Sequence, residues 1–585
     1  MQRNKSKNKL EQIEKVSQNP EMINENITGL LEKFQLKSKF SKFDCLKRCG
    51  VLLSSIVITL VLLPFLGKTT ISGLYNSSMS KIASGKKDAS YEAKKNDKIN
   101  WRWLLLAMAK RFKFLMGKDN KDIVDIKGNA QKHTAIIFDD TTIEKTGRFI
   151  EGIGYVYDHI IHSHILGYKI LVCAYWDGSS VIPIDFSIHR EKRDGKLKKL
   201  LEKIKRLKDK ILNIELTIKK LKDTIRQAKK EFNDANTQYQ NKQGKTNKHK
   251  MERKQRVLDR KQAKLKEQRN KLKSLKIEKS SVETKYEDLK AVIGNCGLKQ
   301  KDFKNQYNKR RQRNSCGHKR IKEADKNKIE TSVSMLKRAV KNGFRPEYVI
   351  TDTWFFCRTI LQAVIDTGRS TELVSMAKIG NAQYKILKDG KFFNPHQIIA
   401  LYERENKKES RKYKAKYIPL QAEYQGIRVK IFLVKFGTHA TWRLLVTTDT
   451  KMSFIKLMDV YKIRWTIEVF FKECKQYLLL GKCQSQDFDA QIADATLSMI
   501  RYILLSYYKR THYEMTIGGI FRKLSQAAIE ENLLADIREY FFELLKIFAE
   551  FVSVDFFELY QELIRKKEVA HLIEKIGLNF EKKVA

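Results

Sequence analysis

The chain has 585 residues, of which 42% are hydrophobic and 31% are charged, so it is long enough for several domains with a sizeable core. Its 117 lysines and arginines outnumber its 67 aspartates and glutamates, which gives a formal net charge of +50. These values exclude a mostly disordered chain. They favour a polyanionic partner, either nucleic acid or an anionic membrane surface.

The eight cysteines are scattered along the chain without a Cys-x-x-Cys pair or a secretory leader. Two short groupings, Cys45 with Cys49 and Cys316 with His318, lack the second half that a zinc finger needs. We therefore expect a cytoplasmic protein in a reducing environment, with neither disulfides nor structural zinc.

The N-terminal part is expected to be helical after a charged start. Residues 1–40 are polar and charged and predict a loosely ordered arm. Residues 41–125 predict a helical domain whose basic aromatic segments favour DNA contact, with a purely packing role as the alternative. The apolar run 51–67 is shorter than the ~20 residues that span a bilayer and contains Pro64. We favour a buried helix there, and a membrane anchor is the alternative.

Residues 130–190 have a β-rich character. A short run from His133 to Phe138 predicts a strand that ends at Asp139 and Asp140. Carboxylates delivered at a strand end are a common way to hold a metal ion. Two further β-rich runs with a short turn between them predict an antiparallel meander.

Residues 195–292 interrupt this pattern with apolar side chains that recur every three or four positions. A polar stretch divides the seam into two halves. The pattern predicts an antiparallel coiled-coil hairpin of roughly 50 Å, or alternatively an intermolecular coil that makes the protein a dimer.

The next segments return to mixed structure. The basic segment 304–328 predicts a loop, which is either a solvated charge run or a strap that follows phosphates. Residues 325–372 contain a β-branched strand that ends at Asp352 and is followed by a helix. Residues 373–450 alternate in the manner of strands and predict a β-rich insertion, and residues 513–585 predict a helical C-terminal region.

Residues 451–512 predict helices, the first with four polar side chains on one face. These side chains are separated by three, four and seven residues, which is helical spacing. An aromatic ring, two cations and one carboxylate suit a metal ion beside a phosphate chain, and a solvated face with one ion pair is the alternative. The four residues are Tyr461, Arg464, Glu468 and Lys475.

Two strand-end aspartates, followed after a β-rich insertion by a glutamate within Tyr-x2-Arg-x3-Glu-x6-Lys, resemble the DDE transposases of bacterial insertion-sequence family four. The resemblance covers roughly residues 100–510. It implies an α/β fold with a ribonuclease-H-like catalytic core assembled from three segments. The segments are residues 130–190, 325–372 and 451–512.

The resemblance also implies the chemistry of the site. Asp140, Asp352 and Glu468 would hold two divalent cations, Mg²⁺ or Mn²⁺, for in-line displacement at a phosphodiester. The activity implied is cut-and-paste transposition, in which the protein binds terminal inverted repeats, excises the element and joins its 3′ ends to target DNA. Members of the family act as homodimers in a synaptic complex. We thus expect a bacterial protein associated with the nucleoid and not with a membrane.

Four further residues acquire roles from the resemblance. Tyr461, Arg464 and Lys475 would contact DNA phosphates near the cleaved end, which suits the forked guanidinium of arginine and the point charge of lysine. Trp442 resembles a tryptophan that stacks on a flipped base during hairpin formation at the DNA end, although a strand tryptophan is often only part of a core.

Several alternatives stay open. The first ligand is either Asp139 or Asp140, because adjacent strand residues face opposite ways, and Asp140 is chosen for its match to an Asp-x-Thr pattern. The coiled-coil hairpin has no role that the resemblance supplies. Other functions are a basic coiled-coil scaffold tethered to a membrane through residues 51–67, or a stand-alone nuclease on the same fold.

Overall fold

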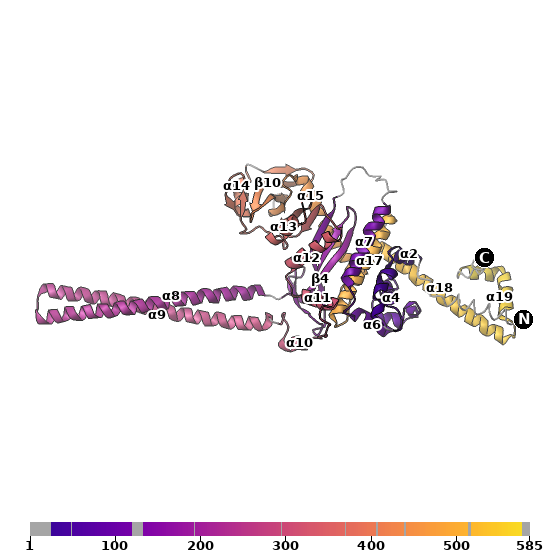
Figure 1. Cartoon of the computed structure of the whole chain (residues 1–585), viewed down its shortest axis with the longest axis horizontal. Helices are drawn as coiled ribbons and strands as arrows, with labels where there is room; N and C mark the ends of the chain where they lie inside the picture. Colours follow the sequence, from indigo (N-terminus) through magenta and orange to yellow (C-terminus); the bar gives the residue numbers. More distant parts are fainter. Residues whose placement is uncertain are drawn as a thin grey trace.

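In the computed structural model, a central body carries a long helical arm on one side, a β-rich lobe above and extended C-terminal helices on the other side (Figure 1). The structure describes residues 25–47, 49–119, 133–191, 194–293, 295–368, 370–404, 407–437, 440–512 and 516–575. Most of the expected N-terminal arm, residues 1–24, lies outside these ranges.

Twelve strands of the described residues join in one sheet. Their bounds are β1 (Ala135–Glu144), β2 (Gly154–Asp158), β3 (Ser163–Trp176), β4 (Val181–His189), β5 (Tyr348–Thr351), β6 (Glu372–Ala377), β7 (Tyr384–Ile386), β8 (Phe392–Phe393), β9 (Lys408–Ser410), β10 (Ala415–Tyr424), β11 (Ile427–Phe436) and β12 (Arg443–Thr447).

The part of the sheet that carries the strand-end aspartates has the order β4-β3-β1-β5-β6. Strand β3 runs antiparallel to β4 and β1, whereas β1, β5 and β6 are parallel. The first half of β1, from Ala135 to Phe138, is fully buried because the strand is central and covered on both faces. This mixed α/β arrangement is consistent with the expected ribonuclease-H-like core.

Helices surround the sheet and form most of the N- and C-terminal regions. Their bounds are α2 (Glu25–Lys33), α3 (Leu36–Phe40), η1 (Ser41–Leu46), α4 (Leu53–Leu62), α5 (Ile71–Tyr75), η2 (Ser78–Ile82), α6 (Lys87–Lys95), α7 (Trp101–Asp119), α8 (Asp194–Asn241), α9 (Lys245–Ile293), α10 (Gln300–Lys304), α11 (Cys316–Glu323), α12 (Lys328–Lys341), α13 (Arg358–Ile365), α14 (Pro395–Tyr402), α15 (Phe454–Lys462), α16 (Trp465–Tyr477), α17 (Phe488–Thr511), α18 (Ile517–Phe551), α19 (Phe556–Arg565) and α20 (Lys567–Lys575).

Helix α17 is the centre of the helical packing. It is buried along most of its length and packs against α4, α6, α7 and β4. Arg501 in its middle donates to the backbone carbonyls of Leu60 (2.5 Å), Val61 (3.0 Å) and Leu478 (2.8 Å). These bonds satisfy a buried guanidinium with the carbonyl groups at the end of α4. The N-terminal helices therefore share one core with the sheet.

The apolar run 51–67 contains α4, which has ten residues and is mostly buried. It packs against α3, α6 and α17, as the buried-helix alternative predicts. Among the described residues, no helix combines the length and the apolar content that a membrane span needs. The run contributes to the core because most of its side chains are apolar, and its buried Ser54 and Thr59 have hydrogen-bond partners in Asp44 and Ser84.

The arm is formed by α8 and α9, which lie antiparallel and side by side along their length (Figure 1). Ile204, Leu207 and Val282 are buried in the seam between them. Within this chain the two halves thus pack on each other. The helices are longer than expected, about 70 Å at 1.5 Å per residue, because α8 continues through the polar stretch as far as Asn241.

The β-rich lobe continues the same sheet. Strand β12 pairs antiparallel with β6, and β11, β10 and β7 follow in order. Helix α18 leaves the body on the side opposite the arm, and α19 and α20 complete the C-terminal part (Figure 1). A small second core forms there, where Leu545 and Ala549 of α18 meet Phe556 and Tyr560 of α19.

Candidate active site

The register of two parallel strands brings two aspartates together. Phe138 of β1 pairs with Thr351 of β5, so the next residue of each strand is an aspartate, Asp139 and Asp352. Residues in register on parallel neighbours share one face of the sheet, and both strands point to the same edge. The two carboxylates therefore lie next to each other, Asp352 directly after β5 and Asp139 within β1. Strand β1 continues to Glu144, so the prediction that it ends at Asp139 and Asp140 was wrong.

The junction of α15 and α16 brings the third carboxylate to this edge. Arg464, which immediately precedes α16, donates from Nη2 to Oε1 of Glu468 at 2.6 Å. Its Nη1 lies 3.4 Å from Oδ2 of Asp139. One guanidinium thus joins the helix glutamate to the strand aspartate. The i,i+4 ion pair that the helix pattern suggested is present, but it is part of a larger cluster.

Tyr461 belongs to the same cluster. Burial raises the pKa of its hydroxyl to about 12, Arg464 opposes the rise, and the nearby charges of Asp352 and Asp139 add to it. The hydroxyl is therefore protonated at neutral pH and remains a hydrogen-bond donor. Tyr461, Arg464 and Glu468 of the helical segment all lie close to the strand-end carboxylates.

The cluster holds more negative charge than its arginine neutralises. The pKa of Asp139 is raised to about 7, first by burial and then by the charge of Asp140; Asp352 adds a smaller rise, and Arg464 lowers it. The backbone N–H of Asp140, which donates to Oδ1 of Asp139 at 2.8 Å, also lowers it without cancelling the rise. Closely spaced carboxylates of this kind favour a bound cation.

Asp140 makes a different set of contacts. Its carboxylate pairs with Nζ of Lys328, the first residue of α12. The same ammonium group lies 4.2 Å from the ring centroid of Trp354. Adjacent strand residues point to opposite faces, so the partner of Asp140 differs from that of Asp139. The arrangement favours Asp139, the residue that the pattern match had ranked second, as the first carboxylate of the cluster.

The donor set fits a hard divalent cation by its chemistry. Asp139, Asp352 and Glu468 supply carboxylate oxygens, which Mg²⁺ and Mn²⁺ prefer. As the side chains stand, no group of three or more His, Cys, Asp or Glu side chains within the described ranges is close enough together to hold a metal ion. The guanidinium of Arg464 contacts two of the three carboxylates.

Lys475 and Trp442 lie outside the carboxylate cluster. Lys475 donates from Nζ to the carbonyl of Thr142 at 2.9 Å, further along β1, and burial lowers the pKa of its amine. Trp442 immediately precedes β12 and is half-buried against the main core. No interaction found for the described residues joins Trp442 to the carboxylates.

Three residues at the site received no role from the sequence. Lys328 pairs with Asp140, and Trp354 is 50% exposed and donates its backbone N–H to Oδ1 of Asp352 at 3.2 Å. Trp465 follows Arg464 and is 62% exposed. An exposed indole beside a charged site is a suitable surface for stacking. For the two tryptophans the available signal was their position within two residues of a predicted site residue, whereas Lys328 had no such signal.

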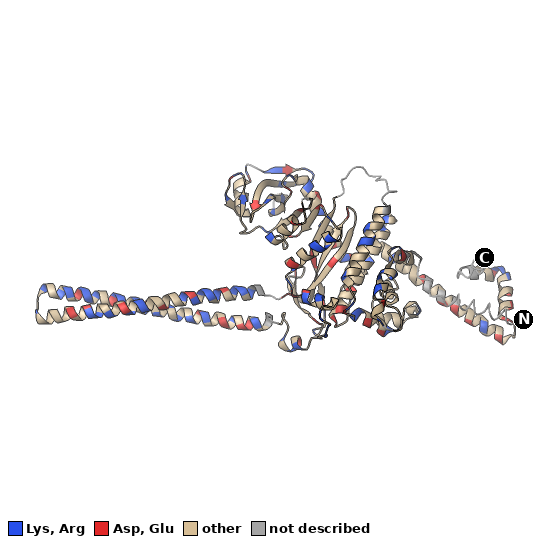
Figure 2. Ribbon diagram, in the orientation of Figure 1, with Lys and Arg blue, Asp and Glu red and all other residues tan. Residues whose placement is uncertain are grey.

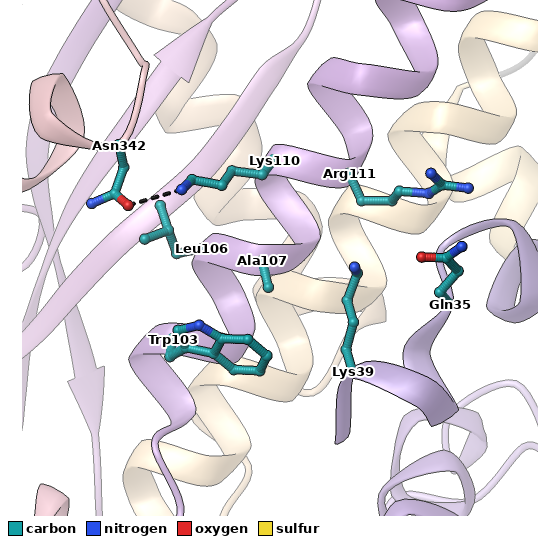
Figure 3. A pocket seen from close by; sticks show the side chains of 8 residues that line it. All are labelled: Gln35, Lys39, Trp103, Leu106, Ala107, Lys110, Arg111 and Asn342. Carbon is teal, nitrogen blue, oxygen red and sulfur yellow. Dashed lines mark hydrogen bonds between the residues drawn. The ribbon is translucent and has the colours of Figure 1, made fainter. Parts of the chain in front are cut away.

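A basic pocket lies apart from the carboxylates, where α7 meets α3 and the end of α12 (Figure 3). Nζ of Lys110 donates to the side-chain oxygen of Asn342 at 2.9 Å. Burial and the neighbouring charge of Arg111 lower the pKa of Lys39. The lining residues are Gln35, Lys39, Trp103, Leu106, Ala107, Lys110, Arg111 and Asn342.

Residues 318–504 match the family model described as "Transposase DDE domain". The matched segment includes Asp352, Tyr461, Arg464 and Glu468, but it does not reach Asp139. A comparison with curated proteins found no match. About a third of the chain is thus similar to a transposase DDE domain.

Proposed function

We propose that the chain is a cut-and-paste transposase that binds the terminal inverted repeats of its element, cleaves at the element ends and joins the 3′ ends to target DNA. One observation carries this proposal. Asp139 and Asp352 follow paired positions of β1 and β5, Arg464 links Asp139 to Glu468, and Asp352 and Glu468 lie in the segment that matches a transposase DDE domain. The net charge of +50 adds the affinity for DNA that such a reaction needs.

In this proposal Asp139, Asp352 and Glu468 hold two divalent cations, Mg²⁺ or Mn²⁺. Bound there, the ions would activate the attacking water or 3′ hydroxyl and stabilise the leaving oxygen. The cations bind ionised carboxylates. Because the pKa of Asp139 is raised, binding of a cation there displaces the proton from its carboxyl group. We propose Asp139 in place of Asp140 as the first ligand, since Asp140 pairs with Lys328 whereas Asp139 lies beside Arg464 and Asp352.

The chain's own cations would position the DNA end. Arg464 can turn from Glu468 and Asp139 to a phosphate, which its planar fork binds with two hydrogen bonds. Tyr461 would donate its hydroxyl to the same strand, and Lys475 would contact a phosphate further along β1. Trp442 is proposed to stack on a flipped base; the exposed rings of Trp354 and Trp465 stand nearer to the carboxylates.

We further propose that the protein works as a homodimer on DNA of the bacterial nucleoid. Helix α18 carries an exposed apolar stripe whose members alternate by four and three residues, the spacing of a coiled-coil seam. Such a stripe on a projecting helix suits pairing with a second copy. Its members are Leu533, Ile537, Tyr540, Leu544, Ile547 and Phe551. The basic pocket at α7 would add phosphate contacts to the same complex.

The test is strand cleavage by the purified full chain on a duplex that contains the element end. The end is read from the genomic DNA that flanks the gene, as inverted repeats bracketed by short direct repeats. We expect cleavage in Mg²⁺ or Mn²⁺, none in a chelator, and none with Glu468→Gln. Cleavage that survives both the chelator and Glu468→Gln would overturn the proposal. Binding without cleavage under every metal condition would favour a regulator that no longer cuts.

A further inference from the structure

We propose that the arm formed by α8 and α9 is a sequence-independent binding surface for duplex DNA, which grips the phosphate backbone along the arm. This inference rests on the proposed function, because a transposase would act on the DNA that the arm binds. It assigns a role to the coiled-coil hairpin, for which the resemblance supplies none. The arm projects away from the body, so a duplex could lie along it without meeting the catalytic core (Figure 1).

The charge of the arm is the first argument. Residues 194–293 contain 32 lysines and arginines but only 14 aspartates and glutamates, a net charge of +18. Figure 2 shows lysine and arginine positions spread along both helices. More than a third of the excess positive charge of the chain thus lies in about a sixth of its length. Charge of this density attracts polyanions through the release of their counterions.

The acidic side chains of the arm are largely used within it. Three ion pairs cross between the helices: Lys203 with Glu278 (2.8 Å), Lys276 with Glu215 (2.8 Å) and Lys254 with Glu231 (2.6 Å). Glutamates at four further positions pair along their own helix; these are Glu202, Glu252, Glu283 and Glu287. The carboxylates therefore set the register of the hairpin, and most cations remain available to an external anion.

The middle of the arm is the most basic part. Residues 210–226 and 261–276 lie side by side, since Nζ of Lys261 donates to the carbonyl of Thr224 at 3.3 Å. Together they hold twelve cations and three carboxylates, and eleven of the cations are exposed. We call this part the central basic section. Its cations are Lys210, Lys219, Lys220, Lys222, Arg226, Lys261, Lys264, Lys266, Arg269, Lys271, Lys273 and Lys276.

The dimensions also match duplex DNA. Helix α8 has 48 residues, so the arm extends about 70 Å at 1.5 Å per residue. A duplex of that length contains about 20 base pairs and presents a phosphate charge every ~1.7 Å along its axis. Lysines and arginines on flexible side chains can follow such a row without reading bases.

Two other occupants are less compatible with the arm. A membrane-bound helix needs an exposed apolar face, but the apolar stripe of the arm is buried in its seam, at Ile204, Leu207 and Val282. A second copy of the arm would bring two surfaces of +18 together, which costs electrostatic free energy. The exposed large apolar side chains of the arm form no continuous seam, since only Leu212 and Leu216 are one helical turn apart; the others are Leu201, Val257 and Ile277.

The experiment uses the full chain with five cations of α9 neutralised: Lys264, Lys266, Arg269, Lys271 and Lys273, each changed to Gln. Affinity for a random 60-base-pair duplex is measured across a salt series. We expect affinity at ~0.1 M salt to fall more than tenfold and the slope of log affinity against log salt to decrease by up to about 4.5, at 0.9 per phosphate contact. Cleavage of a short element-end duplex should be unchanged.

A matched control changes neighbouring uncharged residues, Gln262, Asn270 and Ser274, to Ala, and circular dichroism checks that both variants keep their helices. Equal affinity and equal slope for the wild type and the neutralised variant would overturn the inference. So would a change confined to anionic vesicle binding or to the oligomeric state. Because the salt series needs no catalysis, it stays informative if Glu468→Gln shows the proposed activity to be wrong.

Discussion

Two buried aspartates of the same sheet, Asp185 on β4 and Asp139 on β1, have opposite electrostatic environments. Although burial alone raises the pKa of Asp185, Arg102 (2.7 Å) and Arg338 (2.9 Å) hold it below its ordinary value. Asp139 has only Arg464 at 3.4 Å, beside two other carboxylates, and its pKa rises to about 7. The neutralised cluster stabilises the fold, whereas the cluster with excess negative charge has room for a metal cation.

The largest expected effect is on strand cleavage, and it distinguishes Asp139 from Asp140. Asp139→Asn should lower strand cleavage by at least about 10³-fold, because it removes a ligand of the proposed metal ions, a loss of about 4 kcal/mol in transition-state stabilisation. Asp140→Asn should retain most of the activity, since Lys328 is its partner. Cleavage rates on an element-end duplex at saturating Mg²⁺ compare the two. A larger loss with Asp140→Asn would show that the first ligand is Asp140.

Substitution of Asp185, the aspartate paired with two arginines, should lower the stability of the fold. Asp185→Asn leaves Arg102 and Arg338 with Glu323 as their remaining carboxylate partner, and breaking a buried pair costs up to about 3–5 kcal/mol. We expect a clear fall in the thermal unfolding midpoint, whereas Asp139→Asn should leave the midpoint unchanged or raise it at neutral pH. Equal midpoints for the wild type and Asp185→Asn would contradict the structural role.

The pH dependence sharpens the comparison further. A carboxyl whose pKa is raised on folding binds its proton more tightly in the folded chain, so its contribution to stability is complete below pH 4 and is lost as the pH rises through about 7. In a chelator, wild-type stability should therefore decline over this window relative to Asp139→Asn, with each pKa unit corresponding to about 1.4 kcal/mol. Unfolding midpoints at pH 5, 6, 7 and 8 measure the difference. Parallel curves would show that Asp139 titrates normally.

The smallest expected effect concerns Arg464, the arginine beside Asp139 and Glu468. Arg464→Ala removes the one cation that contacts both Asp139 and Glu468, so the DNA-free chain should bind Mn²⁺ about tenfold more tightly. Cleavage of end DNA should fall at the same time, because the phosphate loses its forked partner. Calorimetry with Mn²⁺ and the cleavage assay read the two effects. Arg464→Gln, which keeps a hydrogen-bond donor without the charge, is the matched control. Unchanged Mn²⁺ affinity would show that Arg464 only supports the helix.

Local patterns were sufficient for some parts of this site. A β-branched run places Asp352 directly after a strand, and the i,i+4 spacing pairs Arg464 with Glu468, because both signals depend only on near neighbours. The single helix expected from Tyr461 to Lys475 is instead divided into α15 and α16 at Ile463 and Arg464. The choice between Asp139 and Asp140 depends on the pairing of β1 with β5. That register is set by contacts more than two hundred residues apart, which no local pattern contains.

The cluster around Asp185 shows the same limit more strongly. Asp185 is one polar residue in an apolar strand, and its partners Arg102 and Arg338 come from helices far away in the sequence. Likewise, the bonds from Arg501 to the end of α4 join the two terminal regions into one core. Such interactions become visible only when distant segments are placed together, so neither was expected.

The pairing of β1 with β5 has a consequence for synthesis of the chain. Ala135 pairs with Tyr348, 213 residues later, and the arm supplies nearly half of that interval. At 5–20 residues per second, β1 waits roughly 10–40 s on the ribosome before its parallel neighbour emerges. Throughout that time the edge of β1 that later pairs with β5 is open to wrong pairing. Because α8 and α9 can pack on each other as soon as both are made, these residues do not compete for that edge.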